Sequence, residues 1–553
     1  RKMKMNFKKI FSAVAAAAML TACVGDLNTI PLNPTDVTSE TAYGADEAGY
    51  VQGLAKIYFQ LTSNNTQDLQ VADGGASEFI RAFWSTQEVT ADAAKCAWGD
   101  AWVNALNNDT WTGDVLNDAV YAVYVRTLQG VAYVNEFLRQ TTDENLTLRG
   151  CSDEVKAKVA AYRAEARFLR AFFYWAAMDT FGQVPFSTEN TPFGGGYNPE
   201  QKPREYVFDF IVEELNDLAS ETSAMPAAQS NYPRADKGSV LGLLARVYLN
   251  AEVYAGKDMY SEAKSTCEKI FGLGYKLAPT HAEVFRGDNG ENPDAMGEIL
   301  FAASYDAENN KSYGGTTYLT LSTLNSDDGA VNITGINGGW AGNRTPDEYV
   351  QAYFAPTAAD FTTGEYTIAD KRAYFYIKGR TQSMKPTFDA EGKEINNLNT
   401  FLCGWSCIKF NNTPHDIDPI EYSTVAATKN FSDIDWPLIR LGEIHLIYAE
   451  ACMHAGGDAS AQVAALAERA GVAAPAAIDA DFLMAERARE LMWEAHRRTD
   501  LIRFGKWISG YNWTFKGGNF GGQDLPAHFN VFPVPSTELA TNLDLQQNPG
   551  YAR

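Results

Sequence analysis

The sequence lacks the short motifs that mark common catalytic sites. It contains no HExxH zinc-protease motif, no GxSxG nucleophile elbow and no GxxxxGK[ST] phosphate-binding loop. It has only six histidines, and none pairs with another at metal-ligand spacing on one helix face. A glycosidase needs two carboxylates at a set separation in space, which a sequence cannot show. The residues therefore offer no positive evidence for an enzyme.

Cysteine is also scarce. Beyond Cys23 the chain has six cysteines, scattered along its length without a CxxC pair. This spacing indicates neither a disulfide framework nor a zinc site. A bridge between Cys403 and Cys407 is an open alternative in an oxidising compartment, and it is not predicted.

Positive charge is too scarce to suit a polyanionic partner. The formal net charge is −23. Removal of residues 1–22 would take away five Lys and Arg side chains and no acidic ones, leaving −28. So acidic a protein is a poor partner for nucleic acid or for anionic lipid surfaces.

The apolar run near the N-terminus is too short to span a membrane. Lysines precede the run Ile10–Leu20, which falls well short of the roughly 20 residues that a bilayer requires. The letters LTAC at 20–23 then resemble a bacterial lipobox, in which the cysteine thiol is acylated. We expect a secretory signal at 1–22 and lipidation at Cys23, the alternative being an ordinary signal peptide with a stray cysteine.

Helical periodicity is the strongest pattern that is present. Between Asp153 and Phe181, core-type residues recur at steps of four and three, the spacing of one buried helix face. They are Val155, Val159, Tyr162, Ala166, Leu169, Phe173 and Ala176. We expect this helix to end at Gly182, since Pro185 then prevents its continuation.

The same pattern predicts a largely helical chain with one interruption. The other expected helices are 46–61, 114–140, 205–219, 237–251, 260–271, 436–455 and 480–507. Small residues among large apolar ones allow antiparallel pairs to pack closely, as in tetratricopeptide units, although the signature of about 34 residues is absent. From about 275 to 431, Gly, Asn, Asp, Thr and aromatics replace the stripe, which indicates a loop-rich insertion with a few short strands.

Acidic residues gather at two places beside the insertion. Asp433 and Asp435 precede an expected helix, and Asp288 begins the oxygen-rich loop DNGEN. Calcium takes six to eight oxygen ligands from such loops. The alternative is that these are solvated turn and N-cap acids. If calcium binds, we expect it to hold the insertion to the scaffold.

Several stretches resemble motifs of the SusD/RagB family, the surface lipoproteins of Bacteroidetes nutrient-uptake systems. In the family's order they are AEARFLRAFFYW and FGQVPF (164–186), PRADKGSVLGLLARVYLNA (233–251), DWPLIRLGEIHLIYAEA (435–451), ERARELMWEAHRRTDLIRFGKW (486–507), and VFPVPSTEL and QQNPGY (531–551). The resemblance implies an all-α, tetratricopeptide-like scaffold with a less regular ligand-facing half.

The resemblance also implies a role. Such a protein captures its ligand without catalysis and caps a TonB-dependent transporter of the SusC type, with its helical face on the transporter. It faces outward at the outer membrane, is attached only through its lipid, and needs no cofactor beyond an optional structural calcium.

We therefore expect six parts along the chain. They are a lipoprotein signal peptide (1–22), a lipidated tether (23–43), a first scaffold part (44–274, with ligand-facing loops at about 62–113), a loop-rich ligand-facing insertion (275–430), a second scaffold part (431–507) and a loop-rich tail (508–553).

Similarity to the starch-binding type of the family extends to ligand-facing positions. It implies that Trp98, Tyr313 and Trp340 form an aromatic arc for a helical α-glucan, with Asp73 and Arg81 as hydrogen-bonding partners. Flat aromatics suit the C–H face of a pyranose, and Asp or Arg suits its hydroxyl rim.

Two positions depart from that type. Ala101 stands where the pattern carries an amide, and Gly290 stands where the calcium pattern carries an acid. Three other hypotheses stay open: capture of peptides or of another glycan, glycosidase activity, and a structural lid without a ligand of its own.

Overall fold

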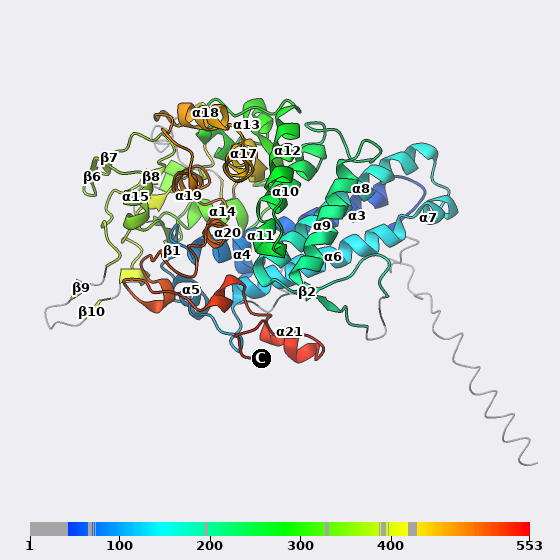
Figure 1. Cartoon of the computed structure of the whole chain (residues 1–553), viewed down its shortest axis with the longest axis horizontal. Helices are drawn as coiled ribbons and strands as arrows, with labels where there is room; N and C mark the ends of the chain where they lie inside the picture. The colour runs from blue at the N-terminus through cyan, green and yellow to red at the C-terminus, as the bar shows by residue number, and fades with distance from the viewer. Residues whose placement is uncertain are drawn as a thin grey trace, which may run out of the picture.

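The computed structural model describes residues 42–64, 69, 71, 73–192, 194, 197–326, 331–385, 387–388, 394–395, 397–417 and 429–553. Figure 1 shows these residues coloured along the chain. The expected signal peptide and the lipidation site at Cys23 lie outside the described residues. Across the ranges just given, no helix combines the length and the hydropathy that a membrane span requires.

Long helices form the scaffold. They are α3 (Ala48–Thr62), α6 (Asp118–Gln140), α8 (Asp153–Phe181), α9 (Arg204–Ala219), α10 (Lys237–Leu249), α12 (Tyr260–Phe271), α17 (Leu441–Ala455), α18 (Ser460–Ala470) and α19 (Ala480–Glu490). Neighbours in the chain pack on each other in succession, α6 on α8, α8 on α9, α9 on α10, α10 on α12 and α12 on α17. Figure 1 shows α6, α8 and α9 side by side. The predicted scaffold of helical pairs is confirmed.

Helix α8 begins and ends where its sequence predicts. The Ser152 side chain accepts a hydrogen bond from the Val155 N–H at 3.2 Å, which caps the N-terminus. Gly182 ends the helix with φ of +73°, a conformation that glycine adopts without strain. A Cβ added at Gly130 of α6 would come within 2.5 Å of the Phe173 ring, so this glycine lets the two helices approach closely.

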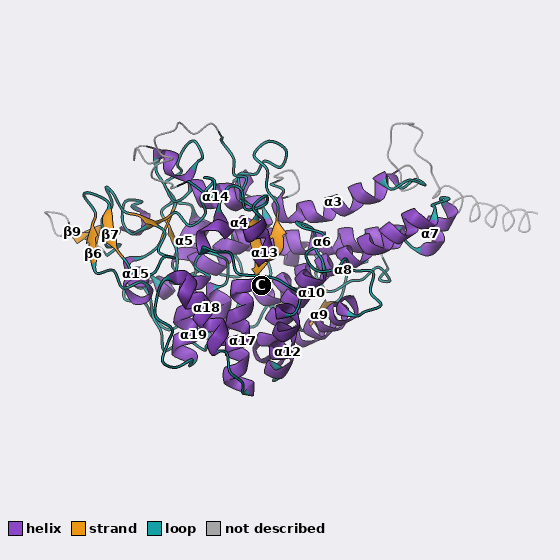
Figure 2. Ribbon diagram, turned by 90° about the horizontal axis from the view of Figure 1, so that it is seen from above, coloured by secondary structure: helices purple, strands orange, loops and turns teal. Residues whose placement is uncertain are grey.

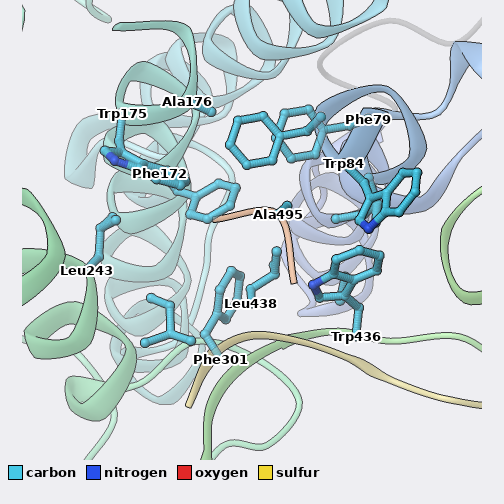
Figure 3. Packing of buried hydrophobic residues seen from close by; sticks show 14 of the residues in the cluster. Phe79, Trp84, Phe172, Trp175, Ala176, Leu243, Phe301, Trp436, Leu438 and Ala495 are labelled. Carbon is cyan, nitrogen blue, oxygen red and sulfur yellow. The ribbon is translucent and has the colours of Figure 1, made fainter. Parts of the chain in front are cut away.

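The core of the scaffold is aromatic. Phe172 of α8 is fully buried, with its ring centroid 5.7 Å from that of Phe301 and 5.4 Å from that of Trp175. Figure 3 shows these rings facing Phe79 and Trp84 of α4 (Phe79–Trp84) and Trp436, which come from two other segments of the chain. Burial of each such side chain stabilises the fold by about 2–3 kcal/mol.

Shorter helices complete the fold. They are α4 (Phe79–Trp84), α5 (Ala101–Asn107), α7 (Asp143–Leu148), α11 (Ala251–Ala255), α13 (Pro293–Glu298), α14 (Gly315–Leu321), α15 (Asp347–Tyr353), α20 (Arg497–Arg503) and α21 (Ser536–Thr541). Three of them, α13, α14 and α15, lie within the expected insertion, which is therefore more helical than its composition indicates. The helices are separated by long loops in this part of the molecule (Figure 2).

The strands are short and form two-stranded antiparallel pairs. The pairs are β1 (Lys95–Cys96) with β5 (Asn343–Arg344), β2 (Val184–Pro185) with β3 (Gln201–Lys202), β4 (Ile299–Ala303) with β12 (Trp436–Arg440), β6 (Ala358–Asp360) with β7 (Glu365–Thr367), β8 (Phe375–Tyr376) with β11 (Ser406–Cys407), and β9 (Thr387–Phe388) with β10 (Glu394–Ile395). Most of them lie at one end of the molecule or at its centre (Figure 2).

The expected helix 436–455 is wrong at its start. Residues 436–440 form β12, which pairs with β4 in register Trp436 to Ala303, and only Leu441–Ala455 is helical. Every residue of β12 is buried, so its apolar run is not confined to one face. A short run of this kind cannot be distinguished from a buried helix by periodicity.

The expected helix 480–507 is wrong in its middle. Helix α19 ends at Glu490 and α20 starts at Arg497. Between them Trp493 and Ala495 have φ of +64° and +63°, which a helix does not allow. The Trp493 indole N–H donates to the Ala93 carbonyl at 3.1 Å, a contact across 400 residues that fixes this turn.

Buried ion pairs attach the insertion to the scaffold. Arg372 of the insertion is fully buried and donates to the Glu490 carboxylate at 2.9 Å, and Lys409 donates to Glu494 at 2.5 Å. Arg440 at the end of β12 bridges both carboxylates at 2.7 and 2.6 Å. Burial alone would raise the pKa of Glu494, but Arg440 and Lys409 outweigh it and hold that pKa below its usual range.

Candidate functional site

The β1–β5 pair brings two tryptophans together. Since the pair is antiparallel, the residues just after β1 lie beside those just before β5. Trp98 follows β1 and Trp340 precedes β5. The Trp98 indole N–H donates to the Trp340 carbonyl at 3.0 Å. Both side chains are partly exposed and pack against the core with their inner surfaces. Residues 242 positions apart thus form one aromatic surface.

Gly342 and the Arg81 guanidinium both pack against the Trp98 indole. A Cβ added at Gly342 would come within 2.8 Å of the indole, so the backbone there lies directly against the ring. The Arg81 guanidinium lies 5.3 Å from the centroid of the Trp98 indole and 4.4 Å from the centroid of the Tyr318 ring. Cation–π contact of this kind fixes the indole in place.

Trp340 sits on a loop bound to the end of α14. Its backbone N–H donates to the Leu321 carbonyl at 2.8 Å, and the next N–H, of Ala341, donates to the Leu324 carbonyl at 2.9 Å. Ala341 adopts φ of +51°, which turns the chain sharply after the tryptophan. Trp340 is therefore fixed by backbone bonds on both sides of its own Cα.

Tyr313 continues the surface beyond Trp340. Its ring centroid lies 6.4 Å from that of Trp340, and the side chain is 55% exposed. Ser312 donates to the buried Glu78 carboxylate at 3.1 Å, and the Gly315 N–H donates to the same group. Burial raises the pKa of Glu78 to about 7. Glu78 thus holds the turn that presents Tyr313.

Asp73 and Arg81 lie together but differ in exposure. The Arg81 guanidinium donates to the Asp73 carboxylate at 2.6 Å; the arginine side chain is 2% exposed and that of Asp73 is 48% exposed. Asp73 also accepts from the Gly75 N–H at 2.8 Å. The geometry leaves the carboxylate open to solvent and makes Arg81 the residue that orients it. Trp98, Trp340, Tyr313 and Asp73 therefore lie at the surface, and Arg81 is buried beneath them, in contact with Asp73 and Trp98.

The structure adds polar and aromatic residues that the sequence did not reveal. The Asn399 amide donates to the Asn104 side chain at 3.4 Å, close to Gly99, where the expected amide at position 101 is missing. Phe431 lies 5.1 Å from Tyr313, ring centroid to centroid. Each of these contacts joins residues more than 100 positions apart, so no local pattern could have indicated them.

Known proteins are similar to this chain along most of its length. A family model described as the SusD family matches residues 297–551, and one described as "Starch-binding associating with outer membrane" matches residues 64–249. The starch-binding protein SusD of Bacteroides thetaiotaomicron is 30% identical over 576 aligned residues, which cover 98% of this chain and 99% of that protein. The chain belongs to the SusD family.

Solved structures share the SusD-family fold. A SusD superfamily protein from Parabacteroides distasonis superposes with a TM-score of 0.67 at 20% identity, over 93% of this chain and all of that one. Surface glycan-binding protein A from Bacteroides thetaiotaomicron, in complex with laminarihexaose, superposes with a TM-score of 0.66 at 18% identity, over 91% and 99% of the two chains. The predicted all-α, SusD-like fold is confirmed.

The carboxylates suggested for calcium already have protein partners in this SusD-family chain. His415 lies 2.6 Å from the Asp288 carboxylate, and Lys429 donates to Asp433 at 2.7 Å. Asp435 accepts from the Tyr232 hydroxyl at 2.8 Å. Among the described residues, no three His, Cys, Asp or Glu side chains gather as metal ligands would. The geometry fits calcium poorly, and the function proposed below does not use it.

The cysteines of the described ranges are buried and free. They are Cys96, Cys151, Cys267, Cys403, Cys407 and Cys452. Burial raises the pKa of the Cys407 thiol to about 12, which leaves it protonated and unreactive. The two cysteines considered for a bridge, Cys403 and Cys407, are not joined.

Proposed function

We propose that this chain captures a glycan on the outer face of the outer membrane and passes it to a SusC-like TonB-dependent transporter. The observation that carries the proposal is the connected row Trp98, Trp340 and Tyr313, with the Asp73 carboxylate exposed beside it. The chain is proposed to bind without catalysis, with a lipid at Cys23 as its anchor.

The chemistry of the row suits a sugar chain. The C–H face of a pyranose packs on a flat aromatic ring, and its hydroxyl rim donates to a carboxylate or an amide. The Trp98 indole is fixed by its hydrogen bond to the Trp340 carbonyl, and the Trp340 side chain packs against the core, so both lose little conformational freedom on binding. The surface is open and the hydroxyls must be stripped of water, so we expect modest affinity.

A starch-like α-glucan is the first ligand that we propose. The relative with 30% identity is named as starch-binding, and this chain keeps Trp98, Trp340, Tyr313, Asp73 and Arg81 together in space. The amide that the starch-binding pattern places at 101 is absent, and we propose that Asn104 and Asn399 supply amides at that end of the row. A fold neighbour binds laminarihexaose, so another glucan is the nearest competitor.

Affinity electrophoresis through native gels tests the proposal. The gels contain amylopectin, levan, xylan or no polysaccharide, and Trp98→Ala runs beside the unaltered chain. Tyr206→Ala is the matched control, because Tyr206 is 47% exposed on α9, apart from the aromatic row. We expect retardation in amylopectin alone, lost in Trp98→Ala and kept in Tyr206→Ala.

Other results would redirect the proposal. Retardation in levan or xylan would keep the capture role and discard α-glucan. Free migration in every gel would favour capture of peptides or a lid without a ligand. Release of reducing sugar by the purified chain, abolished by substitution of one carboxylate, would establish a glycosidase instead.

A further inference from the structure

We infer that Phe431 forms a fourth stacking position, which extends the proposed glycan surface by one sugar beyond Tyr313. The inference rests on the proposed function and concerns how long a glycan the surface reads. Tyr313 lies between two rings, with Trp340 at 6.4 Å and Phe431 at 5.1 Å between centroids. The order along the surface is therefore Trp98, Trp340, Tyr313 and Phe431.

Phe431 has little role in the core. It is partly exposed, and it is absent from the apolar clusters that pack inside the described part of the chain. Trp98 and Trp340, in contrast, both pack against the main cluster. A large apolar ring at the surface that adds little to the core, but touches an exposed tyrosine, is placed for a ligand rather than for stability.

The backbone around Phe431 is held in place. The next N–H, of Ser432, donates to the Thr317 hydroxyl at 3.0 Å, and the Ser432 hydroxyl donates to the Asn412 side chain at 3.3 Å. On the other side, the Lys429 carbonyl accepts from the Asn337 N–H at 2.8 Å. With the backbone held on both sides and the ring against Tyr313, Phe431 can stack on a sugar with a small loss of conformational entropy.

A cation accompanies the fourth ring. The ammonium group of Lys311, an exposed residue two positions before Tyr313, lies 6.0 Å from the Phe431 centroid. An ammonium group donates three hydrogen bonds and suits the hydroxyl oxygens at the rim of a sugar that stacks on the neighbouring ring. The Phe431 end of the surface thus has both parts of a sugar position, a flat ring and a polar group.

Titration calorimetry with a short and a long α-glucan tests the inference. Three sugars of maltotriose can cover Trp98, Trp340 and Tyr313, whereas maltoheptaose also reaches Phe431. We expect Phe431→Ala to weaken maltoheptaose binding about fivefold, the scale of one stacking contact, and to leave maltotriose binding unchanged. Tyr313→Ala should weaken both. Phe59→Ala, which removes a phenyl ring that is 45% exposed on α3, is the matched control and should change neither.

Each contrary result has a distinct meaning. Equal weakening of both sugars by Phe431→Ala would show that the ring only supports Tyr313, and no effect on either would show that it touches no ligand; both results overturn the inference and keep the proposed function. Failure of the unaltered chain to bind maltoheptaose would overturn the α-glucan proposal and the inference with it.

Discussion

The helical scaffold and the loop-rich insertion differ in how they are held. In the scaffold, α8 buries a nearly continuous set of side chains, and the fully buried rings of Phe79 and Phe172 lie 6.1 Å apart. The start of the insertion shares this apolar core through β4, where Phe301 lies 5.7 Å from Phe172. Further along the chain, the insertion is attached through Arg372 and Lys409, whose charged groups meet Glu490 and Glu494 in the interior.

The way in which the insertion is attached affects the geometry of the binding surface. Apolar contacts depend on area and only weakly on direction, so a helical scaffold tolerates small shifts. A buried ion pair stabilises only when its geometry is good and its remaining polar atoms are satisfied. We propose that the ion pairs are retained because they fix the insertion in one orientation. Tyr313 and Trp340, which come from the insertion, must stay in line with Trp98 from the scaffold side.

The largest expected effect comes from breaking the ion pairs at Arg440. Arg440→Met leaves three buried carboxylates, of Glu298, Glu490 and Glu494, without the cation that bridges them. We expect the free energy of unfolding to fall by about 4 kcal/mol, measured by chemical denaturation. Arg139→Met removes an arginine from a partly exposed pair with Glu136 and should change it by less than about 0.5 kcal/mol.

The difference in the free energy of unfolding between the unaltered chain and Arg440→Met should become smaller at acidic pH. Burial would raise the pKa of Glu490, but Arg469 and Arg440 hold it well below the usual value. A carboxyl group with a lowered folded pKa contributes stability above its unfolded pKa and loses it as the pH falls. The unaltered chain therefore loses more stability in acid than the variant. A deficit that stayed constant with pH would contradict the electrostatic account.

A smaller effect is expected in the scaffold. Leu243 of α10 is fully buried beside the aromatic core of Figure 3, and Leu243→Ala leaves a cavity there. We expect a loss of about 3 kcal/mol in the free energy of unfolding, equal at mildly acidic and mildly alkaline pH because no charge is uncovered. A marked pH dependence of the stability lost in Leu243→Ala would show that charged groups also contribute at this position, and would contradict the proposed difference between the two regions.

The sequence predicts elements that local contacts decide better than elements that distant contacts decide. Helix α8 is predicted to the residue, because the buried stripe, Gly182 and Pro185 are all local signals, and the Ser152 cap seen in the structure agrees with them. The strand β12 and the turn at Trp493 are missed, because contacts with β4 and with Ala93 decide them. Elements set by distant partners leave little local signal.

The site follows the same rule. Trp98, Tyr313 and Trp340 come from resemblance to a family, since nothing near them in the sequence shows that they meet. The exposure of Asp73 and the burial of Arg81 are visible only in the folded chain. Phe431 lies 118 positions from the tyrosine that it contacts, just past the expected end of the insertion.

Glu78 links the two regions beneath the site, and its titration gives the next prediction. Its folded pKa, raised by burial from 4.5 to about 7, means that its contribution to stability is present below about 4.5 and is lost as the pH rises through about 7. We expect the stability of the unaltered chain relative to Glu78→Gln to fall by about 2 kcal/mol from mildly acidic to mildly alkaline pH. Denaturation at several pH values measures it.

An exposed carboxylate serves as the control for Glu78. Glu365→Gln on β7 removes a carboxylate whose side chain faces solvent and is measured beside Glu78→Gln. If Glu78→Gln kept a constant difference from the unaltered chain, Glu78 would titrate at its ordinary pKa. Its link between α4 and the Tyr313 turn would then be a simple hydrogen-bond bridge.

The smallest expected effect tests how closely the insertion must meet Trp98. Gly342→Ala places a methyl group 2.8 Å from the indole, so the ring must shift and its hydrogen bond to the Trp340 carbonyl must lengthen. We expect glycan binding to weaken about fivefold while stability falls by less than about 1 kcal/mol, because the indole can move toward solvent. Gly297→Ala, where an added Cβ meets nothing within 4 Å, should leave binding unchanged. Unchanged glycan binding in Gly342→Ala would mean that the aromatic row tolerates a displaced Trp98 indole. The ion pairs beneath the insertion would then stabilise the fold without improving glycan binding.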